Sequence, residues 1–394
     1  MKLAHIAKHS HNIGEGALVD GLRNLIKQSS KSEVNFLDYD RKYFQSISGS
    51  EFSKDSVGLR LDKSFFQRLN KEAHGLVIGG GGIIQSGKYD NFGGLCVAGD
   101  LKDYEELDIP VFLYALGDNR LKSEYTFEYV KEFESLIAKV SSSGGLCSVR
   151  NDGSFERLSE FVDERLMGHV EIIPDPGLFV SRSTKTHPLI QENKINVAIQ
   201  LAGDRIEERL VRGDSRAQEN SFLESIARAI YKLSQKYELN VIVCPHITSD
   251  FHITAKFLDI CANYRIGNSS LAREIINVNF CTKGYEAAPD YFSVYDQSDL
   301  VLGMRGHSAI CSVGLDTPFI GLNSHEKLGG FLNQMDLGQF SIDIVADNFE
   351  GRLLDLTNSL LEDSSLWRTL RDNSVFREKQ ILNKFNKKIL ATFK

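Results

Sequence analysis

Arg305 and His307 stand where an apolar run, residues 300–304, gives way to a segment of small residues. The pattern predicts a buried strand followed by the start of a helix that contains Ser308. Open α/β sheets bind ligands at the carboxyl ends of their strands, and a helix N-terminus there favours an anion. A fixed guanidinium and a titratable imidazole at such a place indicate chemistry on a phosphate or carboxylate. The alternative is that two polar residues close a surface loop.

His246 and Arg150 each follow another predicted strand. We expect His246 to face the same ligand as Arg305, and Arg150 to face it from the first half of the chain. Thr248 or Ser249 is expected to cap the helix that follows His246. A capped turn with an incidental histidine is an equal alternative for His246.

Asn12 and Glu15 lie in the segment that joins the first predicted strand to the first predicted helix. Asn12 and the neighbouring glycines fit a tight turn at a helix N-terminus. Glu15 favours the helix dipole or serves as a general base. A solvated loop is the alternative, and no metal ligand set with suitable spacing accompanies the two histidines at positions 9 and 11.

A run of four glycines, which includes Gly80, Gly81 and Gly82, follows a predicted strand at residues 75–78. Consecutive glycines allow a tight turn and a close approach of the backbone to a ligand. The run matches neither the dinucleotide-binding fingerprint nor a P-loop. We expect either a wall that touches substrate or a tight crossover from strand to helix.

The composition describes a folded protein with a moderately acidic balance. The chain has 394 residues, of which 42% are apolar and 25% charged, with a formal net charge of −7. A nucleic-acid-binding protein would usually show a basic face, so nucleic acid is not an expected partner. Six scattered cysteines without CxxC pairs are expected to be reduced core residues rather than metal ligands. The N-terminus lacks an apolar signal region, and no run reaches the roughly 20 apolar residues of a membrane span.

Short apolar runs alternate with amphipathic helical patterns along the chain, which predicts βαβ units and parallel sheets. The alternation breaks at the polar segment 181–193. We therefore predict an α/β protein with two Rossmann-like domains, residues 1–185 and 194–348, that face each other across a cleft in a GT-B-like arrangement. Residues 349–394 are expected to form helices that pack back across the domains. The first domain would hold the acceptor, and the second would bind the donor.

Seven segments, taken in order, resemble the polysaccharide pyruvyl transferase family. They are NIGEGALVDGL (12–22), GGGGIIQSG (79–87), SVRNDGSFERL (148–158), IIPDPGLF (172–179), VCPHITSD (243–250), MRGHSAICSVGLDTPFIGL (304–322) and HEKLGGFLNQMDL (325–337). The resemblance implies a cytoplasmic transferase that moves a pyruvyl group from phosphoenolpyruvate to a sugar of a surface-polysaccharide precursor and forms a ketal. It implies no cofactor, a saccharide or lipid-linked oligosaccharide acceptor, and is compatible with peripheral association at the inner face of the membrane. In this reaction His307 would supply or relay the proton, and Arg305 would clamp the phosphate or carboxylate.

The chain departs from the family pattern at several positions. Gly306 replaces the usual leucine between the arginine and the histidine, and Glu15 stands where an aspartate is common. Ala202 stands near the place of a usual arginine, for which Arg205 is the nearest substitute, and Ser86 stands where an aspartate is common. These differences bear on donor and acceptor more than on the fold.

Two other functions fit the same predicted fold. One is a GT-B glycosyltransferase that uses a nucleotide sugar, for which Glu326 is the candidate ribose contact. The other is a non-catalytic family member that kept the fold and lost the site. The missing arginine near Ala202 favours the second alternative, whereas Arg305, His307 and His246 disfavour it.

Overall fold

The computed structural model describes residues 1–7, 12–39, 60–84, 92–118, 126–210, 215–279, 287–324 and 326–393. Their contacts divide the chain into two units. The first unit comprises residues Met1–Ser10, Gly21–Pro176 and Glu378–Lys394, and the second comprises His11–Asp20 and Gly177–Arg377. The division therefore runs through two helices, α1 (Ile13–Ser29) and α14 (Ser365–Ala391), and between Pro176 and Gly177, so the polar segment 181–193 lies within the second unit.

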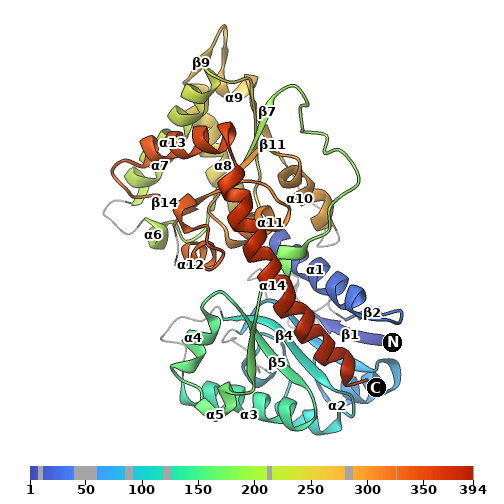
Figure 1. The fold of residues 1–394 in the computed structure, drawn as a ribbon. Coiled ribbons are helices and arrows are strands. Elements are labelled where there is room, and N and C mark those ends of the chain that lie inside the picture. Colours follow the sequence, from blue (N-terminus) through green and yellow to red (C-terminus); the bar gives the residue numbers. More distant parts are fainter. Residues whose placement is uncertain are drawn as a thin grey trace. The chain divides into compact units, whose positions relative to one another are not determined.

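The first unit contains a sheet of six parallel strands in the order β2-β1-β3-β4-β5-β6 (Figure 1). The strands are β1 Lys2–Ile6, β2 Asn35–Asp38, β3 Gly75–Ile84, β4 Val111–Asp118, β5 Leu146–Arg150 and β6 Val170–Ile173. The connecting helices are α2 Lys63–Glu72, α3 Phe127–Ser142, α4 Ser154–Ser159 and α5 Glu164–Met167. Local sequence sets the helix starts: Asp62 and Thr126 accept backbone N–H bonds in the first turns of α2 and α3.

The second unit repeats this architecture with the strand order β11-β8-β7-β12-β13-β14, again all parallel. The strands are β7 Ile195–Gln200, β8 Leu239–Val243, β11 Ile276–Val278, β12 Leu300–Gly303, β13 Phe319–Asn323 and β14 Ser341–Asp343. The helices are α6 Ile206–Arg209, α7 Ser215–Ser234, α8 Asp250–Ala262, α9 Leu271–Glu274, α10 Ala288–Asp296, α11 Gly306–Gly314, α12 Glu326–Gln334 and α13 Phe349–Glu362. A two-stranded hairpin, β9 Arg265–Ile266 with β10 Ser269–Ser270, stands apart from the sheet.

Both sheets follow the order of a doubly wound fold, so each has a point where the direction of strand addition reverses. In the second sheet this point lies between β7 and β12, which are paired so that Gly303 lies opposite Gln200. The predicted α/β class with two parallel sheets and C-terminal helices is confirmed. The strand ends at this reversal are the place to look for a ligand site.

The two units have separate hydrophobic cores made of the strands and the inner faces of their helices. Every residue of β8 and β12 is buried, as expected for strands covered on both faces. Ile13 and Ala17, at the start of α1, belong to the core of the second unit. Five described cysteines are buried: Cys96, Cys147, Cys244, Cys261 and Cys311. In the part of the chain that the structure describes, no helix combines the length and the apolar character needed to cross a membrane.

The glycine run does not form the expected turn or crossover, because it lies inside β3. Gly80 and Gly81 have φ angles of 80° and 135°, which side chains rarely adopt. A Cβ on Gly79 would meet the backbone of Tyr114 on β4. The glycines thus permit an irregular, buried strand close to its neighbour, where the register with β4 shifts.

Several other sequence predictions can be compared with the structure. The sequence pattern predicts a strand at 239–243 and a helix at 250–262, which are the observed bounds of β8 and α8. It predicts the first helix from residue 17, whereas α1 begins at Ile13. β14 and the β9–β10 hairpin were not predicted. The segment 41–62 is rich in Ser and Asp, which is typical of a loop or lid. Most of this segment, Ser86 and the histidines at positions 9 and 11 lie outside the described residues.

Candidate anion site

Arg305 is positioned by the two central strands of the second sheet. It directly precedes α11 and has an extended backbone conformation, with φ −93° and ψ 146°. Its backbone N–H donates to Oε1 of Gln200, the last residue of β7, over 2.9 Å. The side chain therefore starts at the reversal point of the sheet, beside the N-terminus of a nine-residue helix.

The buried carboxylate of Asp250 holds the Arg305 guanidinium in place. Nε of Arg305 donates to Oδ2 of Asp250 over 2.8 Å, and Nη2 contacts Oδ1. The Asp250 side chain is 0% exposed and also accepts backbone N–H bonds from Gly203, His246 and Ile247. The expected cap of α8 by Ser249 is thus wrong, since Ser249 makes no side-chain cap bond. Asp250 ties together the loops after β7, β8 and β12.

A second carboxylate, that of Asp204 after β7, bridges two arginines. Its Oδ1 accepts from Nη2 of Arg305 over 2.7 Å and from Nη2 of Arg209 over 3.3 Å. Arg209 is itself anchored elsewhere, because Nε donates to the backbone oxygen of Asp204 and Nη1 donates to Oγ of Ser324. The site therefore contains two arginines and two aspartates.

Burial and charge act in opposite directions on these groups. Burial raises the pKa of Asp204, but the charges of Arg305 and Arg209 outweigh it and hold that pKa below the ordinary value. Burial lowers the pKa of Arg305, yet the bonds and charges of Asp250 and Asp204 raise it above the ordinary value. Burial also lowers the pKa of Arg209, although a guanidinium stays charged at neutral pH. The four side chains together carry no net charge.

His246 lies beside this cluster and is buried among aromatic rings. Its Nε2 is 2.8 Å from the hydroxyl of Tyr295, and its ring also packs edge-on against Tyr291 and Phe292. Nδ1 is buried and has no hydrogen-bond partner among the residues that the structure describes. Burial, followed by the charges of Arg305 and His307, holds the pKa of His246 well below its ordinary value. The ring is therefore a neutral imidazole at physiological pH.

His307 lies in the first turn of α11 and against the first turn of α1. A Cβ built on Gly14 would overlap its ring, at 2.5 Å from Cγ. The start of α1 is held in the second unit by a bond from the Ile13 N–H to the backbone oxygen of His246, and Oδ1 of Asn12 accepts from the Gly14 N–H. Two helix N-termini and two histidines thus meet beside Arg305.

The remaining predicted site residues of the second unit differ in burial and in what they contact. Glu15 is buried in the first turn of α1. The hydroxyl of Ser308 donates to the backbone oxygen of Arg305, so it closes the first turn of α11. Arg205 is exposed and has a φ of 55° directly before α6. Arg209, four residues later, is the arginine that reaches the cluster.

Arg150 and the glycine run lie in the first unit. Arg150 is the last residue of β5 and is held by Asp175 over 2.9 Å and by Asp152 over 3.0 Å. Asp175, which lies between two prolines, therefore carries a buried ion pair in addition to its turn. The described residues of either unit contain no group of three or more His, Cys, Asp or Glu side chains arranged to hold a metal ion.

Sequence reasoning missed Asp204, Arg209, Asp250 and Tyr295. The available signal was that acidic residues follow β7 and β8 at the same edge where Arg305 follows β12. Neighbouring strand ends bring such side chains together in a parallel sheet, so opposite charges at these ends become candidates for pairing once the strand order is known.

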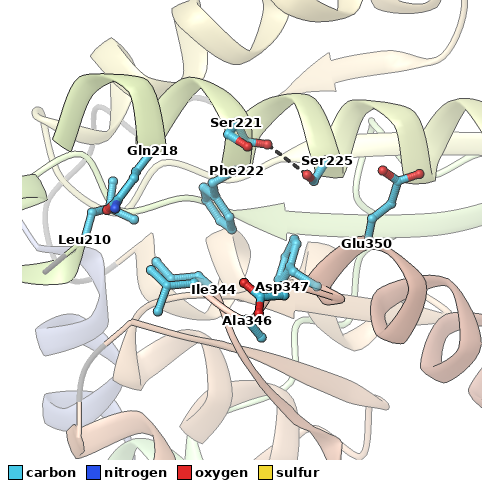
Figure 2. A pocket seen from close by; sticks show the side chains of 11 residues that line it. Leu210, Gln218, Ser221, Phe222, Ser225, Ile344, Ala346, Asp347 and Glu350 are labelled. Carbon is cyan, nitrogen blue, oxygen red and sulfur yellow. Dashed lines mark hydrogen bonds between the residues drawn. The ribbon is translucent and has the colours of Figure 1, made fainter. Parts of the chain in front are cut away.

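A separate cavity of about 400 Å³ lies in the second unit between α7 and the segment after β14 (Figure 2). Its lining residues are Leu210, Gln218, Ser221, Phe222, Ser225, Ile344, Val345, Ala346, Asp347, Phe349 and Glu350. In the described part of the chain, none of the predicted site residues lines it, and its charged lining residues are two carboxylates. Such a lining does not suit an anion, so we place the candidate site at the arginine cluster instead.

Comparisons with known proteins bear on both the family and the fold. A family model described as polysaccharide pyruvyl transferase matches residues 12–326. A comparison with curated proteins finds no match. These results rest on sequence, and the family expected from the seven segments is confirmed.

Solved structures extend the comparison to the whole chain. A putative UDP-N-acetylglucosamine 2-epimerase from Listeria monocytogenes is 12% identical, with a TM-score of 0.58, and the match covers 100% of this chain and 96% of that chain. UDP-GlcNAc 2-epimerase from Neisseria meningitidis bound to UDP-GlcNAc is 12% identical, with a TM-score of 0.57. The match covers 99% of this chain and 100% of that chain. A glycosyltransferase from Rickettsia africae is 11% identical, with a TM-score of 0.51. The match covers 100% of this chain and 97% of that chain. At these identities the likeness shows the fold alone, and the predicted GT-B-like fold is confirmed.

Proposed function

The chain belongs to the polysaccharide pyruvyl transferase family, and from this premise we propose that it transfers a pyruvyl group from phosphoenolpyruvate to a sugar of a surface-polysaccharide precursor. The observation that carries the proposal is the meeting of Arg305, His307 and the N-termini of α1 and α11 at one edge of the second sheet. Phosphoenolpyruvate presents a carboxylate and a phosphate, and cations with helix N-termini are the groups that bind such anions.

Arg305 binds the donor in this proposal. A guanidinium forms paired hydrogen bonds with carboxylate or phosphate oxygens. The contacts of Arg305 with Asp250 fix its orientation before the donor arrives, so little reorganisation is needed on binding. Asp250 therefore acts as a positioning residue for Arg305.

His307 handles the proton. The methylene carbon of the enol gains a proton, and the adjacent carbon becomes an oxocarbenium ion that a sugar hydroxyl attacks with loss of its own proton. The bond from this carbon to the phosphate oxygen then breaks, and a second hydroxyl closes the ketal. Of the two hydroxyl protons, one replaces the proton given to the methyl group and the other leaves with phosphate. An imidazole suits this relay because its ordinary pKa lies near neutrality.

The neutral state of His246 fits the same site. A positive charge on His246 would be repelled by Arg305 and His307, and this repulsion contributes to the low pKa of His246. His246 therefore orients the site through its backbone, which donates to Asp250 and accepts from Ile13. The acceptor is a saccharide or a lipid-linked oligosaccharide, and the reaction takes place in the cytoplasm or at the inner face of the membrane.

The test is a direct assay of the purified chain with phosphoenolpyruvate and candidate oligosaccharides. We expect release of inorganic phosphate together with a new ketal methyl signal on the sugar in the proton spectrum. The His307→Ala variant serves as the control for phosphate released by contaminants. Release of a nucleoside diphosphate from a nucleotide sugar, without use of phosphoenolpyruvate, would instead identify a GT-B glycosyltransferase. Activity with neither donor would identify a non-catalytic family member.

A further inference from the structure

Asp204 occupies the position between two arginines that an anionic ligand group would take. One of its oxygens, Oδ1, lies within hydrogen-bond distance of both Arg305 and Arg209. Two guanidinium groups that converge on one oxygen form a binding site for a carboxylate or phosphate. The Arg209 side chain is only 9% exposed, so this arginine is built into the unit rather than mobile on its surface.

The two aspartates of the cluster differ in how firmly they are held. Asp250 is 0% exposed and accepts three backbone N–H bonds in addition to its contacts with Arg305 and Gln200. The Asp204 carboxylate is 32% exposed, and its side-chain hydrogen bonds in the described structure come from Arg305 and Arg209. Asp204 can therefore leave the cluster and be solvated by water, whereas Asp250 cannot without stranding buried N–H groups.

Neither arginine depends on the Asp204 carboxylate for its position. Arg305 is held by Asp250 through Nε and Nη2. Arg209 is held by the backbone oxygen of Asp204 and by Ser324. If the Asp204 side chain rotates away, both guanidinium groups stay in place and lose one carboxylate partner.

We propose that Arg305 and Arg209 together bind one oxyanion group of the substrate, and that Asp204 is an internal competitor for this place. Arg209 is then a second anion ligand, and Asp204 sets the affinity of the site. The proposal takes only the identity of the substrate from the proposed function. Displacement of Asp204 changes the charge of the cluster: two arginines opposed by two aspartates become two arginines opposed by Asp250 alone. An incoming anion thus meets a positive site only after it has displaced Asp204.

The experiment measures binding of inorganic phosphate and of phosphoenolpyruvate to the full chain by isothermal titration calorimetry. Asp204→Asn keeps the size of the side chain and removes its charge, so we expect anion binding to tighten by on the order of 10-fold. Asp259→Asn, at an exposed position of α8, removes the same charge elsewhere in the unit and should leave affinity unchanged. Arg209→Gln should weaken binding by a similar factor. Unchanged or weaker phosphate binding in Asp204→Asn, with the native unfolding midpoint, would overturn the proposal.

Asp250→Asn gives a matched contrast at the firmly held aspartate. It should weaken phosphate binding, because Arg305 loses its orientation, whereas a general effect of negative charge would tighten binding in both variants. If Asp204→Asn does not fold, Arg209→Gln decides, and unchanged affinity in that variant rejects the shared site. Phosphate is a probe that needs no pyruvyl transfer. Tighter phosphate binding without any use of phosphoenolpyruvate would reject the proposed function alone, and transfer activity with unchanged affinity in Asp204→Asn would reject this inference alone.

Discussion

Each unit holds an arginine between two carboxylates at the end of a parallel strand, but the surroundings of the two arginines differ. Arg150, the last residue of β5, is 9% exposed and contacts Asp175 and Asp152, whose side chains are 3% and 15% exposed. Arg305, after β12, contacts one fully buried carboxylate and one that is one-third exposed. The first cluster is therefore mostly buried, and we call it the closed cluster; the second is open to solvent at Asp204.

The backbone around the two arginines reinforces this contrast. A Cβ on Gly117 of β4 would collide with the Arg150 guanidinium, so the neighbouring strand packs directly against that side chain. Beside Arg305, a second arginine, Arg209, donates to Asp204 over 3.3 Å, whereas the second arginine of the first cluster, Arg157, stays 3.9 Å from Asp152. A mostly buried ion pair stabilises loops, whereas a partly exposed carboxylate between two arginines can be exchanged for the carboxylate of a ligand. Similar residue types at similar places in two sheets therefore support different expectations for substitution.

The largest effect expected from this contrast is the loss of transfer activity in the second unit. His307→Ala should lower kcat by about 10²–10⁴-fold, because the variant lacks the group that relays the proton. The unfolding midpoint should stay close to that of the native chain. His252→Ala, at an exposed histidine of α8, is the matched control. A near-normal kcat in His307→Ala would show that His307 does not relay the proton.

The next effect concerns the closed cluster of the first unit. Arg150→Ala removes the buried cation that pairs with Asp152 and Asp175. Breaking such a buried ion pair should lower the free energy of unfolding by about 3–5 kcal/mol. Arg305→Ala should cost less, because Asp250 keeps its three backbone donors and Gln200. Hydrogen exchange of the β5 and β12 amides reports the two units separately.

The comparison of Arg150 and Arg305 also has a kinetic side. We predicted Arg150 to contact substrate, and this stays a prediction. If it is correct, the conservative Arg150→Lys variant raises the KM for a substrate while hydrogen exchange stays native. A purely stabilising role leaves KM unchanged.

The sequence predicted the sheets better than the site. The strands are apolar runs covered on both faces, and the helices between them have local start signals, so short windows of sequence suffice for β8 and α8. The glycine run was misplaced for a physical reason. Glycine usually marks turns, but here it allows β4 to approach β3 closely, and no local pattern reveals a neighbouring strand.

The site was predicted only in part because its contacts are distant in sequence. Arg305 meets Asp250 across 55 positions and Asp204 across 101. Strand order decides which ends are neighbours, and the order was not predicted. The inclusion of residues 11–20 in the second unit likewise depends on tertiary packing of Ile13 and Ala17. Arg305 and His307 could be found because the end of a buried strand is visible in the sequence itself.

A smaller expected effect tests whether the start of α1 positions the open site. Gly14→Ala places a methyl group against the His307 ring, so either α1 or the imidazole must shift. A misplacement of about 1 Å can cost up to 10²-fold in rate, and we expect kcat to fall by about 10-fold or more. Gly351→Ala in α13, where a Cβ meets no atom within 4 Å, is the control. Equal activity in the two variants would show that the start of α1 does not position His307 for the reaction.

The smallest expected effect is a pH dependence of stability in the second unit. The pKa of His246 is held well below its ordinary value, chiefly by burial. As the pH falls below about 6.5, the unfolded chain binds a proton at this histidine while the folded chain does not. The unfolded state is then favoured, so stability is fully present above pH 6.5 and falls by at most about 1.4 kcal/mol per pH unit.

Trp367, the one tryptophan of the sequence, is buried in the second unit, and its fluorescence during urea unfolding reports this unit. His187, whose pKa burial also lowers, contributes in the same direction in every variant. His246→Gln keeps a polar group near Tyr295 and should give a flatter dependence between pH 7.5 and 5.0. Equal slopes in the two proteins would mean that His246 binds its proton at the same pH in the folded and the unfolded chain, so that the folded site beside Arg305 gains a positive charge below about pH 6.5.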